Sequence, residues 1–151
     1  YKLPSMIEEI FTKEDDINQL SKALVGKEIF MIGRANDYTS LLEAALKIKE
    51  LAYINVNAYI GGEIKHGPIA LIDDKTVVIG LSLDEKLNIL VTNDKLNTNV
   101  FDEIILIPDG KKEIEEMASI VIFQLLAKDL ALLLNRDVDK PRNLAKVVTV
   151  E

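Results

Sequence analysis

The spacing of apolar residues divides the chain into amphipathic helices, buried strands and two largely buried helices. Helical spacing of apolar residues predicts helices over Lys2–Phe11 and Glu14–Leu24, and Gly26 ends the second. Apolar runs rich in β-branched residues predict strands at Glu28–Ile32, Thr76–Leu81, Leu87–Thr92 and Glu103–Ile107. The remaining predictions are a helix at Tyr38–Ile54 that is apolar nearly all round and buried on most sides, a loop at Ala58–Ile64, a helical turn at Pro68–Leu71 and a long helix at Lys112–Leu134.

This alternation of strands and helices predicts an α/β fold, a three-layer αβα sandwich with a mainly parallel sheet. The 151 residues suit a single domain, 1–151. One connection does not fit, because only Ser82–Lys86 separates the strands at Thr76–Leu81 and Leu87–Thr92. Parallel neighbours need a crossover of about a dozen residues. The pair is therefore an antiparallel hairpin, or the chain has lost a crossover helix; the two-sided apolar character of both strands favours parallel pairing with an interrupted chain.

Composition excludes several classes of site. The chain has no cysteine and one histidine, which rules out disulfides, thiolate chemistry and multi-histidine metal sites. A net charge of −7 argues against nucleic-acid or anionic-membrane partners. The most apolar segment has its longest uncharged run at Met117–Ala127, short of the roughly 20 residues that span a bilayer. We expect a cytoplasmic protein with no cofactor and no metal. The start at Tyr1 suggests a piece of a longer protein.

Three charged residues share one stripe of the helix predicted at Tyr38–Ile54. Offsets of four and seven residues place Glu43, Lys47 and Glu50 on the same side. One interpretation is an ordinary salt-bridge ladder. The other is a charged row lining a cleft, because charges on a mostly apolar helix must be paired or solvated.

Two further side chains are candidates for chemistry. His66 sits beside Gly67 and Pro68, where a rigid turn could aim the ring into a cleft or simply hold it as a structural residue. Lys146 lies among aliphatic neighbours near the chain end. A buried lysine loses basicity and becomes a nucleophile near neutral pH, whereas a snorkelling lysine only packs its stem. The turn at Gly33–Tyr38 could bind an anion, but it lacks the spacing of nucleotide-binding motifs.

Several motifs occur in the order found in one enzyme family. They are Gly33-Arg34, Tyr38, Glu43-Ala44-Ala45-Leu46-Lys47-Ile48-Lys49-Glu50, Gly62-Glu63-Ile64-Lys65-His66-Gly67-Pro68, Asp137-Val138-Asp139-Lys140-Pro141-Arg142-Asn143-Leu144-Ala145-Lys146 and Val148-Thr149-Val150-Glu151. From about Leu3 to Glu151 the chain resembles the C-terminal end of the glucosamine-6-phosphate synthases, also called glutamine–fructose-6-phosphate aminotransferases (isomerizing). The resemblance identifies the chain as the second of two sugar isomerase (SIS) domains in the isomerase half.

The resemblance implies a function and roles for individual residues. The family converts fructose 6-phosphate and ammonia, which a glutaminase domain releases from glutamine, to glucosamine 6-phosphate. Lys146 in the tail 137–151 matches the imine-forming lysine, and Glu50 matches the base that moves a proton between C1 and C2. His66 matches a ring-opening histidine donated across a homodimer interface. Lys47 matches a lysine that assists the proton transfer, and the Ala145 backbone matches a sugar contact.

Departures from the family leave alternatives open. Ala35 and Ala44 stand where glycine is usual, and Val147 stands where serine is common. The family has a helix between the strands that flank Ser82–Lys86, and this sequence has none. The first SIS domain, with its phosphate-binding loop, and the glutaminase domain are absent, so we expect this piece alone to be inactive. The alternatives are a non-catalytic SIS module that binds a sugar phosphate and dimerises, or a purely structural dimerisation domain.

Overall fold

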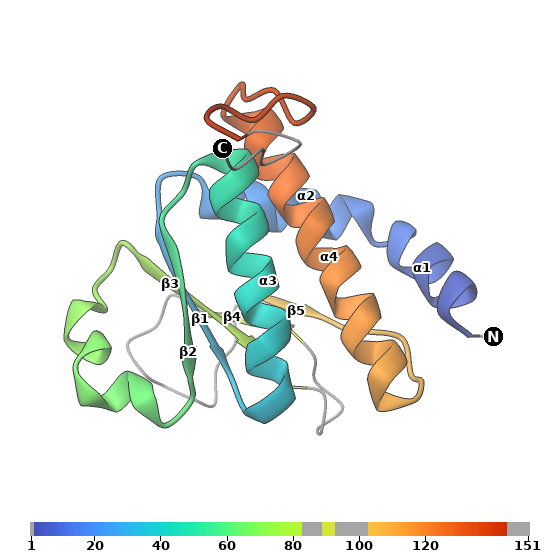
Figure 1. Cartoon of the computed structure of the whole chain (residues 1–151), viewed down its shortest axis with the longest axis horizontal. Coiled ribbons are helices and arrows are strands. Elements are labelled where there is room, and N and C mark those ends of the chain that lie inside the picture. Colours follow the sequence, from blue (N-terminus) through green and yellow to red (C-terminus); the bar gives the residue numbers. More distant parts are fainter. Residues whose placement is uncertain (1, 83–88, 93–102, 145–151) are drawn as a thin grey trace, which may run out of the picture.

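The fold is a five-stranded sheet with α-helices packed along one face (Figure 1). A computed structural model describes residues 2–82, 89–92 and 103–144. The strand order is β2-β1-β3-β4-β5, and the strands are β1 (Glu28–Gly33), β2 (Val56–Ile60), β3 (Thr76–Leu81), β4 (Ile89–Thr92) and β5 (Glu103–Ile105).

The two halves of the sheet have different pairing. β2, β1 and β3 are parallel, with Ile29 opposite both Val56 and Val77. β4 is antiparallel to β3, with Ile79 opposite Val91, and β5 is antiparallel to β4. The prediction that the strands at Thr76–Leu81 and Leu87–Thr92 run parallel is therefore wrong. The segment between Leu81 and Ile89 is too short for a crossover, so chain length overrides the apolar pattern.

β2 corrects a second prediction, which placed a loop over Ala58–Ile64. The strand Val56–Ile60 lies at the edge of the sheet, and only Val56 in it is buried. An edge strand with one buried position needs no continuous apolar run, and Asn57 interrupts the run here. The remaining strands lie within about two residues of their predicted bounds over the described part of the chain.

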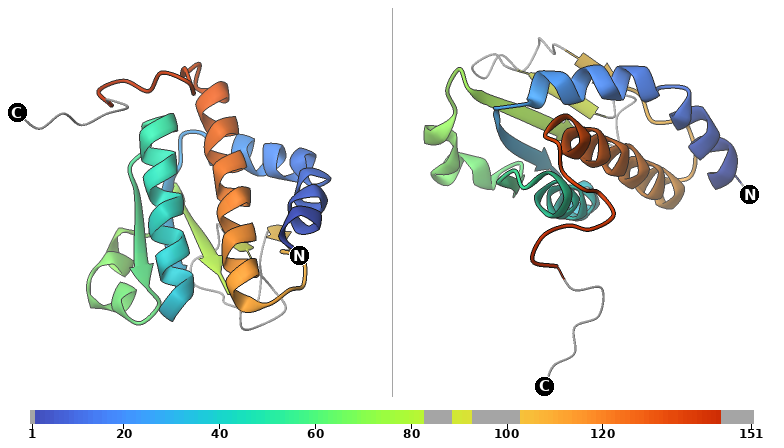
Figure 2. Two further views of the ribbon diagram at one scale, coloured as in Figure 1. Left: turned by 45° about the vertical axis from the view of Figure 1, so that its right-hand side comes forward. Right: turned by 90° about the horizontal axis from the view of Figure 1, so that it is seen from above.

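Four α-helices bury one face of the sheet in a single core (Figure 2). Side chains of β1 and β3 on this face, Ile29, Met31, Val77, Ile79 and Leu81, are all buried. The predicted helices are confirmed within three residues, although Tyr38–Ile54 is not buried all round, because Leu42 and Leu46 are 46% and 45% exposed. The helices are α1 (Leu3–Phe11), α2 (Glu14–Leu24), α3 (Ala35–Ala52) and α4 (Lys112–Leu133).

The other face carries the β2–β3 crossover, which contains two short 3-10 helices, η1 (Glu63–His66) and η2 (Pro68–Leu71). α3 connects β1 to β2, whereas this crossover runs in the opposite direction across β1. Right-handed crossovers in opposite directions lie on opposite faces, and η1 and η2 accordingly lie away from α3 (Figure 2). Helical segments therefore flank the sheet, and the predicted α/β class is confirmed.

The direction of the parallel strands defines two edges of the sheet. The carboxyl edge, where β1, β2 and β3 end, holds the β1–α3 turn and η1. The amino edge, where these strands begin, holds the last turn of α3 and the end of α4. Because α3 and α4 both run toward the amino edge, the tail after α4 starts beside the end of α3 (Figure 1).

Candidate functional site

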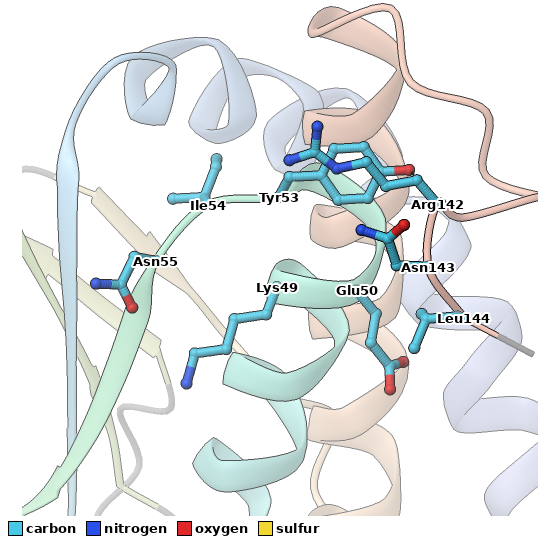
Figure 3. Close-up of a pocket in the computed structure, with 8 residues that line it drawn as sticks. All are labelled: Lys49, Glu50, Tyr53, Ile54, Asn55, Arg142, Asn143 and Leu144. Atoms are coloured by element: carbon cyan, nitrogen blue, oxygen red, sulfur yellow. Dashed lines mark hydrogen bonds between the residues drawn. The ribbon is translucent and has the colours of Figure 1, made fainter.

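A cavity of about 440 Å³ opens at the amino edge of the sheet (Figure 3). One wall comes from the end of α3 and the residues leading into β2, and the other comes from the tail. The lining residues are Lys49, Glu50, Tyr53, Ile54, Asn55, Arg142, Asn143 and Leu144. The cavity thus joins Glu50 to the tail segment that leads to Lys146, although the two lie far apart in sequence.

Lys47 is ion-paired to both acidic residues of the helix stripe. Its Nζ lies 2.8 Å from a Glu50 carboxylate oxygen and 3.5 Å from one of Glu43. The three side chains are 27–39% exposed, so the row is neither a buried charge cluster nor a fully solvated ladder. The hydrogen bond to Glu50 is the main cause that raises the pKa of Lys47 above its usual value; burial opposes it, and the charges of Glu50 and Glu43 add to it.

The predicted single cleft for Glu43, Lys47 and Glu50 is only partly formed. Glu50 lines the cavity, while Lys47 reaches it through its hydrogen bond to Glu50. Glu43 stays on the stripe and does not line the cavity. The Lys47 amine thus lies against one side of the Glu50 carboxylate. Glu50 itself is one of the residues that line the cavity (Figure 3).

His66 lies at the opposite edge of the sheet. It is the last residue of η1, after the end of β2, and it is exposed. Glu50 precedes the start of β2, so the five residues of β2, about 17 Å of strand, separate the two. One chain therefore does not bring His66 and Glu50 together. Anion binding at the Gly33–Tyr38 turn, also at the carboxyl edge, stays a prediction.

Local contacts hold the first part of the tail. The side chain of Asp137 accepts hydrogen bonds from the backbone N–H groups of Asp139 and Lys140, at 3.0 and 3.1 Å, and Val138 packs against the core. The proposed site residues Ala145 and Lys146 lie outside the described residues. Leu144, directly before them, lines the cavity.

Several residues of the cavity were not predicted. Tyr53 follows α3 with a left-handed backbone (φ 60°, ψ 30°), a conformation that favours glycine or asparagine. No sequence pattern marks Tyr53 as a site residue, although it follows Glu50 by only three positions. Arg142 belongs to the Pro-Arg-Asn motif of the tail, but its contact with Tyr53 depends on tertiary structure.

In the described part of the chain no helix is long and apolar enough to cross a membrane.

Comparison with known proteins supports the resemblance. A family model described as "SIS domain" matches residues 24–123. Glutamine–fructose-6-phosphate aminotransferases (isomerizing) of Clostridium acetobutylicum and Methanosarcina acetivorans are 36% and 34% identical over 99% of this chain. The solved C-terminal domain of glucosamine-fructose-6-phosphate aminotransferase from Francisella tularensis aligns with a TM-score of 0.76 at 25% identity, and the match covers 92% of this chain and 45% of that one.

The comparison also shows how this chain differs in length. It spans about 28% of the length of the two aminotransferases. The alignment with the C. acetobutylicum protein extends over 169 residues, whereas this chain has 151, so at least 18 aligned positions have no counterpart here. Eighteen positions are enough for a helix with its connections, such as the helix that the resemblance implied between β3 and β4. The resemblance itself is confirmed, and the chain belongs to the SIS domain family.

Proposed function

We propose that the chain is the sugar-isomerising domain of a cytoplasmic aminosugar synthase that makes glucosamine 6-phosphate from fructose 6-phosphate and glutamine-derived ammonia. Residues 1–151 form its second SIS domain, with residues 137–151 as a catalytic tail. The observation that carries the proposal is the cavity that joins Glu50 to the tail (Figure 3). A first SIS domain that binds the sugar phosphate and a glutaminase domain complete the enzyme.

Lys146 is the nucleophile in this proposal. Leu144 lines the cavity, and Lys146 follows two residues later. Consecutive Cα atoms are about 3.8 Å apart, so the Lys146 Cα can be no more than about 7.6 Å from the Leu144 Cα. From that distance the four-carbon side chain of a lysine can reach the cavity that Leu144 lines. The Lys146 amine attacks C2 of the open-chain ketose, a nitrogen–carbon bond forms, and the carbonyl oxygen leaves as water. Ammonia then replaces the lysine on C2, and the Ala145 backbone contacts the sugar.

Glu50 is the proton shuttle. The imine draws electrons toward nitrogen, which makes the C1–H bond more acidic. The Glu50 carboxylate takes the C1 proton and gives it to C2, while the C1 hydroxyl loses its proton and the nitrogen gains one. The ketose imine thereby becomes the 2-amino aldose with no net gain or loss of protons. Lys47 supports this transfer because its ammonium, 2.8 Å from a Glu50 oxygen, holds the charged carboxylate in place before it takes the C1 proton and again after it gives that proton to C2.

His66 acts in a neighbouring subunit's site. It stands exposed at the carboxyl edge, whereas Glu50 lies at the amino edge of the same chain. In a homodimer the exposed imidazole of one subunit reaches the sugar held at the other subunit's Glu50 and opens the ring by proton transfer. This supplies the histidine role without any movement of His66 within its own chain.

Trapping with borohydride tests the proposal. In the complete enzyme incubated with fructose 6-phosphate, reduction should attach the hexose phosphate to Lys146, as located by peptide mass spectrometry. Lys146→Ala should lose both the adduct and isomerisation. Lys140→Ala, which removes a lysine from the same tail, should keep both. An intact isomerisation rate in Lys146→Ala, or an adduct on another lysine, would refute the assignment.

A further inference from the structure

Tyr53 holds the tail against the end of α3. The backbone N–H of Arg142 donates a 2.8 Å hydrogen bond to the Tyr53 hydroxyl. The guanidinium carbon of Arg142 lies 4.3 Å from the centre of the tyrosine ring, and that of Arg136 lies 5.2 Å from it. Tyr53 therefore receives two cation–π contacts at its ring and one hydrogen bond at its hydroxyl from residues that follow α4. Figure 3 shows Arg142 beside the Tyr53 ring.

We propose that Tyr53 is a positioning residue that fixes the catalytic tail beside Glu50. The inference rests on the proposed function, because its purpose is to bring the Lys146 amine and the Glu50 carboxylate to one sugar. Tyr53 comes three residues after Glu50, about one helical turn, and both line the cavity. Arg142 comes four residues before Lys146. Contact between Tyr53 and Arg142 thus sets the distance between the two reacting groups.

The backbone of Tyr53 supports a role for its ring. A bulky residue with φ of 60° is unfavourable, and glycine or asparagine would fit the conformation better. The chain just after α4 has a left-handed residue of the favoured kind, Asn135, with φ of 54°. At Tyr53 the chain has a bulky residue in a conformation that such residues rarely adopt. The benefit lies in the ring, which lines the cavity and is not part of the hydrophobic core cluster.

The contact from Arg136 is fixed by the end of α4. The N–H of Arg136 donates to the Ala131 carbonyl at 2.8 Å, and the N–H of Asn135 donates to the Leu132 carbonyl at 3.0 Å. This is the Schellman pattern, with Asn135 as its left-handed residue. It directs the chain after α4 toward Tyr53, so that Arg136 and Arg142 both contact the ring. The tail is therefore held at two points six residues apart.

The decisive variant is Tyr53→Asn, because asparagine suits the left-handed backbone but has no ring. In the complete enzyme we expect its urea midpoint to be unchanged or higher, since backbone strain is relieved. We expect trypsin to cut after Arg142 roughly tenfold faster, because the tail opens more often. The kcat should fall roughly 10- to 100-fold as the amine loses its orientation. The KM for fructose 6-phosphate should stay within about twofold.

Two conservative variants serve as matched controls. Tyr53→Phe keeps the ring and its cation–π contacts but loses the hydroxyl that accepts from Arg142, so it should recover most of the kcat lost in Tyr53→Asn. Tyr59→Phe removes a hydroxyl from β2, where Tyr59 stacks edge-on against Phe30 at 5.5 Å and not against the tail. It should leave trypsin cleavage and kcat unchanged.

The outcomes separate this inference from the proposed function. Unchanged cleavage and kcat in Tyr53→Asn would overturn the inference while Lys146 trapping could still succeed. A fall in the urea midpoint that tracks the loss of activity in Tyr53→Asn would show a merely structural role and also overturn it. If the wild type forms no Lys146 adduct, the proposed function fails, and faster cleavage in Tyr53→Asn would then establish tail binding alone and overturn the positioning role.

Discussion

At the amino edge of the parallel strands, Glu50, Tyr53 and the tail surround one cavity, whereas at the carboxyl edge His66 stands exposed at the end of η1. In open α/β sheets, ligands usually bind at the carboxyl ends of the strands. Here the cavity lies at the other edge, because the chain after α4 returns to the end of α3. The difference teaches that, under the proposed function, each edge of this domain supplies only part of a site.

The largest effect that can test this comparison comes from mixing subunits. Glu50→Gln and His66→Asn should each lower isomerisation by roughly 100-fold or more in the complete enzyme, as expected for loss of an acid or base. When the two variants are co-expressed, a mixed dimer has one site with wild-type Glu50 and the partner's wild-type His66. Recovery should approach about a quarter of wild-type activity, since half of the dimers are mixed and each has one working site. The measurement is the steady-state rate of purified mixtures.

The control for this prediction is a single chain that carries both substitutions, co-expressed with the wild type. Its mixed dimers have one Glu50→Gln site served by a wild-type His66 and one Glu50 site served by a His66→Asn partner, so they should add nothing to the activity of wild-type dimers. If His66 served its own chain, mixed dimers of the single variants would show no recovery, whereas mixed dimers of this control would each keep one working site.

The inner strands β1 and β3 could be predicted from the sequence, whereas the edge strand β2 and the pairing direction of β4 could not. β1 and β3 are buried on the face that packs against the helices, so their apolar runs were clear. β2 was missed because it is a half-buried edge strand. β4 was predicted to be parallel because its apolar run is two-sided, but the pairing found is antiparallel. In the site, spacing placed Glu43, Lys47 and Glu50 on one stripe. The contact of Tyr53 with Arg142 joins residues 89 positions apart, which no local pattern encodes.

The second prediction concerns stability at the carboxyl edge. A Cβ on Gly33 would lie 2.9 Å from the Tyr38 backbone nitrogen and 2.9 Å from a Leu41 methyl group. The helix backbone cannot give way as a side chain can, so Gly33→Ala should lower the free energy of unfolding by about 1–3 kcal/mol. Gly62→Ala, at the same edge, meets nothing within 4 Å and should change it by less than about 0.5 kcal/mol. Urea unfolding of both variants checks the pair, and equal midpoints would contradict the close approach at Gly33.

The third prediction concerns the end of α4 at the amino edge. Asn135→Ala should lower the free energy of unfolding by about 1 kcal/mol, because alanine is disfavoured in the left-handed conformation that Asn135 adopts. Asn135→Gly should be neutral within a few tenths of a kcal/mol. Thermal unfolding of the two variants gives the difference. A loss equal in both would mean that the asparagine side chain, and not the backbone conformation, stabilises the end of α4.

The smallest predicted effect is the pH dependence of the Lys47 ion pairs. The pKa of Lys47 is raised in the folded protein, mainly by its hydrogen bond to Glu50. The folded state therefore holds this proton more tightly than the unfolded state, whose lysine has its usual pKa of about 10.5. The stabilisation is complete below about pH 10.5 and is lost as the pH rises through the higher folded value.

Lys47→Met should consequently lower the free energy of unfolding by about 0.5 kcal/mol at pH 8, a magnitude typical of partly exposed pairs on one helix. The difference from the wild type should stay constant from about pH 8 to 10 and shrink as the pH rises further. The raised pKa of Lys128, caused mainly by its hydrogen bond to Glu14, is common to both proteins and cancels in the difference. Lys49→Met provides the matched control, because Lys49 is exposed on the same helix and makes no ion pair with the described residues. A difference for Lys47→Met that grows above pH 10.5 would contradict the assignment, since it would mean that the uncharged amine contributes more to the folded state than the ammonium held between Glu43 and Glu50.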